Sequence, residues 1–163
     1  MTYPFFARCF PLIVVLLFSG AGISAQMANA TSPKASPNIK LHSHNAVTQT
    51  ALIIKDAQAT VKRGKVYSGN LAKAVNQQNL AVTFYNKSEY IKAIHHTRYA
   101  RKLAVGTIRA NRGKVATSME NDGAVISEPS PTDADLDAAV EGMAGMQLKD
   151  QTAVDAVLLT VKD

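Results

Sequence analysis

Three consecutive segments of the chain repeat apolar or small residues at spacings of three and four, which is the period of one helix face. The segments run from Asn45 to Arg63, from Tyr67 to Tyr85 and from Glu89 to about Asn111. Their stripes are Val47, Ala51, Ile54, Ala57 and Val61; Tyr67, Leu71, Ala74, Gln78, Ala81 and Tyr85; and Ala93, Thr97, Ala100, Ala104 and Thr107. The pattern predicts three amphipathic helices that pack closely through small side chains.

Terminal residues delimit the three helices. Asn45 and Ser88 are predicted to cap the first and third helices at their N-termini. Gly64 and the run Asn111-Arg112-Gly113 are typical of left-handed helix C-termini. Gln78 interrupts the second stripe, so we expect it to be half exposed.

Two short helices are predicted near the C-terminus, after a loop at residues 114–130. The first, Pro131 to Ala144, has Thr132 and Asp135 at capping-box spacing. The second, Asp150 to Val161, has Asp150 as its predicted cap, although residues 157–161 alone also fit a strand. The predicted fold class is all-α, a small antiparallel helical bundle of three main helices plus two short C-terminal helices.

Residues 1–25 have the features of a cleavable signal peptide. Arg8 precedes the apolar run Phe10 to Phe18, and cleavage is predicted after Ala25 or Ala30. The apolar run is shorter than the ~20 residues of a membrane-spanning helix, which disfavours an uncleaved anchor. We expect an exported protein, periplasmic or extracellular, in which polar residues 26–43 form a flexible spacer.

Removal of the signal changes the composition of the product. It takes away Cys9, the only cysteine, and four of the five phenylalanines, and the chain has no tryptophan. The mature chain then has no disulfide, thiol nucleophile or cysteine-ligated metal. Its core has to be built from aliphatic side chains and a few tyrosines.

Charge is divided unequally along the chain. Residues 55–114 hold 13 Lys or Arg against 2 acidic residues, a net +11. Residues 115–163 hold 2 Lys or Arg against 10 acidic residues, a net −8. The formal net charge of +6 for the whole chain conceals this asymmetry.

Three interpretations of the asymmetry stay open. The basic face is simply solvated, or the acidic segment 131–163 folds back on the basic helices of 44–113, or the basic helices bind a polyanion. For an exported protein we expect an envelope polymer or anionic lipid surface rather than nucleic acid. The candidate anion-binding residues are Lys62, Arg63, Lys65, Lys92, Arg98, Arg101 and Lys102.

Catalytic and metal-binding patterns are not evident. The sequence has no nucleophile elbow, phosphate loop or paired-histidine zinc motif. Of the four histidines, His42 and His44 lie in the spacer and its boundary, while His95 and His96 diverge by about 100° on a helix. We predict no catalytic residues, metal, cofactor or identifiable small-molecule substrate. We expect the four imidazoles to lie at the surface or half-buried, and an enzyme is the least favoured class.

Residues 71–110 resemble a single tetratricopeptide-like helix pair, on the residues Leu80, Ala81, Phe84, Tyr90, Ala93 and Ala100. In that family, small residues near Ala81 and Ala93 let the two helices cross closely. Ser88 replaces the usual Gly, Thr97 replaces a large apolar residue, and no Pro closes the repeat. The resemblance implies a protein-interaction scaffold and carries over no catalytic residues.

The function expected from these features is a non-catalytic helical binding or structural protein of the cell envelope, with an unidentified envelope protein as partner. The alternative is binding of an anionic polymer or membrane surface through the basic helices. An uncharacterised enzyme is the third class.

Overall fold

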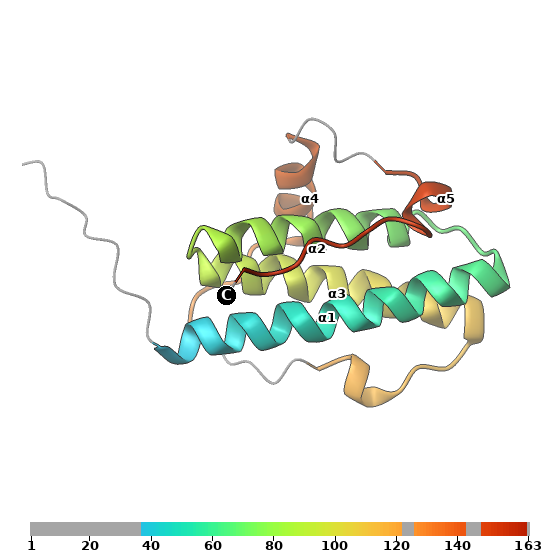
Figure 1. Cartoon of the computed structure of the whole chain (residues 1–163). Helices are drawn as coiled ribbons and strands as arrows, with labels where there is room; N and C mark the ends of the chain where they lie inside the picture. Colours follow the sequence, from blue (N-terminus) through green and yellow to red (C-terminus); the bar gives the residue numbers. More distant parts are fainter. Residues whose placement is uncertain (1–36, 122–125, 143–147, 163) are drawn as a thin grey trace, which may run out of the picture. The chain divides into compact units, whose positions relative to one another are not determined.

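The computed structural model describes residues 37–121, 126–142 and 148–162. The predicted signal peptide with both cleavage sites, spacer residues 26–36 and the Asp122-Gly123 pair lie outside these ranges. Three long helices, α1 (Pro37–Gly64), α2 (Asn70–Asn86) and α3 (Tyr90–Arg112), lie side by side (Figure 1). A 3-10 turn, η1 (Thr117–Met119), and two short helices, α4 (Asp133–Glu141) and α5 (Asp150–Ala153), follow.

The described residues contain helices and no strands, which confirms the predicted all-α bundle. Short connections make α2 antiparallel to both α1 and α3. None of the helices in the described ranges is long and apolar enough to cross a membrane.

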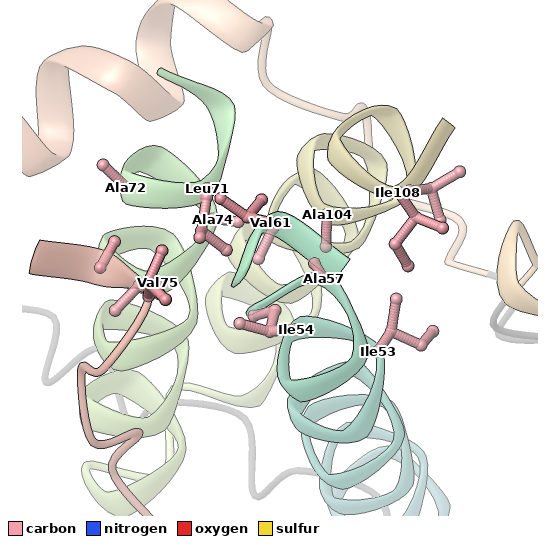
Figure 2. Packing of buried hydrophobic residues seen from close by; sticks show 14 residues of the cluster. Ile53, Ile54, Ala57, Val61, Leu71, Ala72, Ala74, Val75, Ala104 and Ile108 are labelled. Carbon is pink, nitrogen blue, oxygen red and sulfur yellow. The ribbon is translucent and has the colours of Figure 1, made fainter. Parts of the chain in front are cut away.

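The core lies where the three stripes meet. Figure 2 shows Ile54, Ala57 and Val61 of α1 facing residues of α2 and α3. These and the other central residues are fully buried, among them Leu71, Ala74, Val75, Ala100 and Ala104. The alanines let the helix backbones approach closely, as the small residues of the sequence predict.

Helix α1 begins earlier than predicted. It starts at Pro37 rather than Asn45, so the expected spacer gives way to helix seven residues before its predicted end at residue 43. A proline favours the first helical position, where its missing N–H would have no helical partner. Ser43 and Ala46 are buried and anchor the early turns, whereas Asn45 is an exposed residue within the helix rather than its cap.

Two helix ends also differ from the prediction. Gly64 is the last residue of α1, and the left-handed residue is Lys65, with φ 55°. A Cβ on Gly64 would lie 3.1 Å from the Cβ and Cγ of Asn111, so Gly64 serves close packing. Ser88 has φ 64° and lies one residue before the N-cap position of α3, which Glu89 occupies, so the prediction that Ser88 caps this helix is wrong. Gly113, with φ 74°, ends α3 as predicted.

Gln78 is fully buried, so the expectation that it is half exposed is wrong. Its Nε2 donates a hydrogen bond to the carbonyl oxygen of Val47 on α1, at 2.8 Å. Its Oε1 accepts one from the hydroxyl of Thr97 on α3, also at 2.8 Å. Because both ends of the amide are satisfied, Gln78 joins the three helices at little desolvation cost.

The C-terminal half begins as predicted and ends differently. Thr132 and Asp135 form the expected capping box at the start of α4, although α4 ends at Glu141 rather than Ala144. Helix α5 ends at Ala153 instead of Val161, and residues 157–162 form neither helix nor strand. The β-branched residues Val157, Thr160 and Val161 have low helix propensity, and Asn79 and Asn86 of α2 accept hydrogen bonds from the backbone of this run.

Asp150 caps a different helix from the one predicted. Its carboxylate accepts hydrogen bonds from the backbone N–H of Gly69 (2.5 Å) and of Ala72 (2.8 Å), at the start of α2. Asp150 is itself buried, and Lys149 occupies the N-cap position of α5. A carboxylate at this end satisfies unpaired N–H groups and complements the helix dipole.

Candidate functional site

A cationic groove of about 440 Å³ runs along α3, on the side that faces η1. Its lining residues are Arg98, Arg101, Lys102, Val105, Arg109 and Glu120. Arg98, Lys102, Val105 and Arg109 are separated by three or four residues in turn, so they share one face of α3, and Arg101 lies at the edge of that face. Four cationic side chains and one carboxylate line this hollow.

Three of the seven predicted anion-binding residues therefore come together here: Arg98, Arg101 and Lys102. Arg109 was missed, although its position seven residues after Lys102 places it on the same helix face. Glu120 was missed because it comes from beyond the helix, and no periodic pattern links it to α3.

Arg101 forms the inner wall rather than an exposed contact, because it is only 3% exposed. Its Nε donates to the hydroxyl of Thr50 at 3.1 Å, and one terminal nitrogen donates to the carbonyl oxygen of Asn121 at 2.6 Å. The guanidinium thus ties α3 to α1 and to the segment after η1. The sequence prediction of a surface contact at Arg101 is wrong, because its neighbours on the face, Ala100 and Ala104, are core residues.

The other cations of the groove have acidic neighbours at its edge. Arg109 pairs with Glu120, and Lys102 pairs with Asp133 at the start of α4, with 2.5 Å between Lys102 Nζ and the carboxylate. All four of these side chains are at least 46% exposed, so the pairs are weak and exchangeable. Arg98 is half-buried, and its charge helps to lower the pKa of neighbouring His95, after the larger effect of burial.

The remaining predicted residues lie elsewhere. Lys62 pairs with Asp155 at 2.7 Å, and Arg63 donates to Ala59 in its own helix, both at the C-terminal end of α1, where Lys65 follows. Lys92 pairs with Glu89 at the start of α3 and lies 5.3 Å from the centre of the Phe84 ring. The start and end of α3 are about 30 Å apart at 1.5 Å per residue, so the seven residues do not form one surface.

The acidic C-terminal half does dock on the basic helices. Asp133 and Asp137 of α4 pair with Lys102 and Lys73, and Asp155 pairs with Lys62. This is the arrangement of the fold-back interpretation, and it leaves the groove on α3 with more positive than negative side chains.

A polar network lies between α2, α3 and α4. Gln77 Oε1 is 2.7 Å from Nδ1 of His96, and Gln77 Nε2 donates to the carbonyl oxygen of Leu136 at 2.8 Å. The Phe84 ring stacks on His96 with 5.1 Å between centres. Burial, followed by the charges of His95 and Lys92, lowers the pKa of His96 to about 4. At neutral pH His96 is therefore an uncharged hydrogen-bonding group.

The histidine environments correct one expectation. His95 and His96 are both buried, at 9% and 5% exposure, instead of lying at or near the surface. They are adjacent on α3, and Gln77 and Phe84 of α2 contact His96. Within the ranges described, no three His, Cys, Asp or Glu side chains gather closely enough to hold a metal ion.

Tyr99 belongs to the same region. Burial first, and then the nearby Asp137 carboxylate with its hydrogen bond, raise the pKa of Tyr99 to about 12. The Lys102 ammonium lies 5.9 Å from its ring centre. Tyr99 therefore stays a neutral phenol that joins α3 to α4.

A second hollow, of about 610 Å³, lies between the start of α2, α4 and α5. Charges of both signs line it, including Lys73 and Lys149 against Asp137 and Glu141. It borders the end of α4, beyond which residues 143–147 lie outside the described ranges. Its mixed charges distinguish it from the cationic groove.

No protein-family model, curated protein or solved structure matches this chain. The resemblance of α2 and α3 to a tetratricopeptide-like pair stays a prediction, and function has to be argued from the site.

Proposed function

We propose that this chain is an exported, non-catalytic binding protein of the cell envelope that holds an anionic group in the groove on α3. The observation that carries this proposal is the concentration of four cationic side chains along one hollow: Arg98, Arg101, Lys102 and Arg109. The sequence features of a signal peptide support export, and an acidic envelope component is the partner that an exported cationic groove would meet.

The groove suits a discrete phosphate or carboxylate group. Guanidinium groups bind such anions through two parallel hydrogen bonds, and two of the three groove cations other than the buried Arg101 are arginines, Arg98 and Arg109. Val105 adds an apolar surface in the floor, where it is 5% exposed. A hollow of this size suits a single unit the size of a sugar or a lipid headgroup better than it suits contact with the flat surface of a bilayer.

The surrounding acids set the strength of binding. Glu120 and Asp133 must release Arg109 and Lys102 before an incoming anion can take both cations. Because these pairs are exposed, exchange costs little, and we expect binding that weakens steeply as salt rises.

The test measures binding of the mature chain to an acidic polysaccharide, polygalacturonate, and to vesicles with and without phosphatidylglycerol, from 25 to 500 mM salt. The groove variant combines Arg98→Gln, Lys102→Gln and Arg109→Gln. The control variant combines Lys55→Gln, Lys87→Gln and Lys114→Gln, three exposed positions outside the groove.

We expect the groove variant to lose about tenfold or more in affinity and the control about twofold or less, because each phosphate or carboxylate contact contributes separately. Equal losses in the two variants would assign binding to overall charge and not to the groove. No binding at 25 mM salt, or turnover of the bound polymer, would contradict the proposal.

Export is tested separately by fractionating cells that express the full chain and sequencing the N-terminus of the product. The expected product begins at Gln26 or Thr31 and lies outside the cytoplasm. An intact N-terminus in the cytoplasmic fraction would reject export without affecting the groove.

A further inference from the structure

The last described residues form an extended tail across α1 and α2. After α5 the chain turns back and runs between these two helices (Figure 1). Gln58 of α1 donates its Nε2 to the carbonyl oxygens of Ala153 (2.7 Å) and Ala156 (2.9 Å). Asn79 and Asn86 of α2 accept hydrogen bonds from backbone N–H groups farther along the tail.

The two asparagines match the step of an extended chain. Asn79 Oδ1 accepts from the N–H of Leu159 at 2.9 Å, and Asn86 Oδ1 accepts from the N–H of Lys162 at 3.0 Å. Seven helical residues span about 10.5 Å, and three extended residues span about 10 Å. Side-chain amides two turns apart on α2 can therefore accept hydrogen bonds from every third N–H of a peptide that lies along the helix.

Partly buried side chains of the tail that lie on α1 and α2 are interspersed with exposed ones. Ala156, Leu158 and Val161 are partly buried, and Val161 packs on Val47, Ala81 and Val82. Val157 is 88% exposed and Leu159 is 49% exposed. The surface of α1 and α2 under the tail is thus apolar, and its polar contacts, apart from the pair of Lys62 with Asp155, go to the backbone of the tail.

The tail is attached more weakly than the segment before it. Asp150, Ala153 and Val154 are buried and hold α5 on α2, whereas every residue from Asp155 to Lys162 is at least partly exposed. The ion pair of Asp155 with Lys62 is solvent-exposed. Residues 155–162 can therefore leave the surface of α1 and α2 while α5 and the bundle stay in place.

We propose that the groove between α1 and α2 is a binding site for an extended peptide of a partner protein, and that residues 155–162 occupy it in cis as a competing ligand. The peptide chemistry is given by the tail: a small or apolar residue at the position of Ala156, apolar residues at those of Leu158 and Val161, and free backbone N–H groups at those of Leu159 and Lys162. This site is independent of the anion groove on α3.

The experiment uses the mature chain and a fluorescent peptide with the sequence of residues 154–163. The double substitution Leu158→Asp, Val161→Asp weakens the tail without altering the groove. The matched control is Val157→Asp, which adds a charge at an exposed tail position. Helicity measured by circular dichroism shows that the bundle is intact; if the double variant loses it, a chain that ends at Val157 replaces it.

We expect the tail-weakened chain to bind the peptide at least about tenfold more tightly than the wild-type chain or the Val157→Asp control, because a tethered tail competes at roughly millimolar effective concentration. Adding Asn79→Ala and Asn86→Ala to the tail-weakened chain should abolish that gain. Absence of peptide binding, or binding that ignores the two asparagines, would overturn the proposal.

Backbone methylation of the peptide sharpens the test. N-methyl groups at the positions of Leu159 and Lys162 remove the N–H groups that donate hydrogen bonds to Asn79 and Asn86, so they should abolish binding. N-methyl groups at the positions of Val157 and Thr160 should weaken the affinity of the peptide by no more than about threefold, which is less than about 1 kcal/mol. Equal effects at all four positions would reject main-chain recognition.

Discussion

The basic bundle of α1–α3 and the acidic half after it are held by different interactions. The bundle buries an apolar core of fully enclosed side chains and adds internal amide and hydroxyl contacts, such as those of Gln78. Among the described residues of the acidic half, few are buried, namely Leu136, Val140, Asp150, Ala153 and Val154. Its other contacts are mostly exposed ion pairs and hydrogen bonds to its backbone.

The comparison shows that charge complementarity contributes to the contact between the halves and not to the core of the bundle. The opposite charges of the two halves favour their contact, but exposed pairs contribute roughly 0–1 kcal/mol each. Burial of apolar side chains stabilises the bundle by more per residue. The bundle is therefore the stable unit, and the acidic half covers it with contacts that can open locally, as both proposed binding sites require.

The largest effect tests the core of the bundle. Ile54→Ala should lower the free energy of unfolding by about 2–5 kcal/mol, because Ile54 is fully buried and its truncation leaves a cavity. Leu52 is two residues away and 62% exposed, so Leu52→Ala should lower the free energy of unfolding by less than about 0.5 kcal/mol. Urea unfolding followed by circular dichroism measures both, and similar losses would contradict the packing of α1.

The second effect is a pH dependence that belongs to the bundle. The pKa of His96 is about 4 in the folded chain, against 6.5 for an ordinary histidine. Above pH 6.5 the ring is neutral in both states. As the pH falls from 6.5 to 4, the unfolded chain gains a proton that the folded chain lacks, so stability falls by at most about 3 kcal/mol, and by less where solvent reaches the ring.

Urea unfolding at pH 7, 5 and 4 measures this loss. His96→Gln should flatten the profile over that window, whereas His42→Gln, at an exposed position of α1, should leave it unchanged. A profile that His96→Gln does not alter would assign the pH dependence to other groups.

The third effect tests a buried anchor between the halves, the carboxylate of Asp150. Asp150→Ala removes the acceptor for the N–H groups of Gly69 and Ala72, so it should destabilise the start of α2 and the docking of α5 by about 1–2 kcal/mol. The control is Asp155→Ala, which removes an exposed carboxylate paired with Lys62. Hydrogen exchange should show faster exchange at residues 69–73 for Asp150→Ala only; the same response in both variants would remove the distinction between anchor and surface pair.

The smallest effect tests the exposed charge pairs. Lys73→Gln and Lys102→Gln remove the partners of Asp137 and Asp133, and each should cost less than about 1 kcal/mol in low salt. In 0.5 M salt the difference from the wild-type chain should vanish, because exposed pairs are screened. A loss above 2 kcal/mol that persists in high salt would show that these pairs, and not burial, hold α4.

The helical stripes could be predicted because each depends on neighbours three and four residues away. Val47, Ile54, Ala57 and Val61 are buried as their spacing indicates, and Thr132 with Asp135 starts α4 as predicted. The groove itself was not predicted, although Arg98 and Lys102, two of the candidate anion-binding residues, line it.

The errors arise where a side chain acts on a distant segment. Gln78 interrupts its stripe, and nothing near it in the sequence indicates Val47 and Thr97 as partners. Asp150 resembles a local cap, yet it binds N–H groups about 80 residues earlier. Residues 157–161 have an ambiguous local preference, and the hydrogen bonds of Gln58 to Ala156 just before them and of Leu159 to Asn79 favour an extended chain.

The sequence by itself determined the three helical stripes, the separation of charge and the small residues at the helix contacts, because these depend on local spacing and composition. Only the tertiary structure decided which cations share a groove, that Arg101 is an internal tie, and that the C-terminal residues lie as a tail on α1 and α2. The physical reason is that hydrogen bonds and burial between distant segments form only after the helices have packed, and their energies then outweigh weak local preferences.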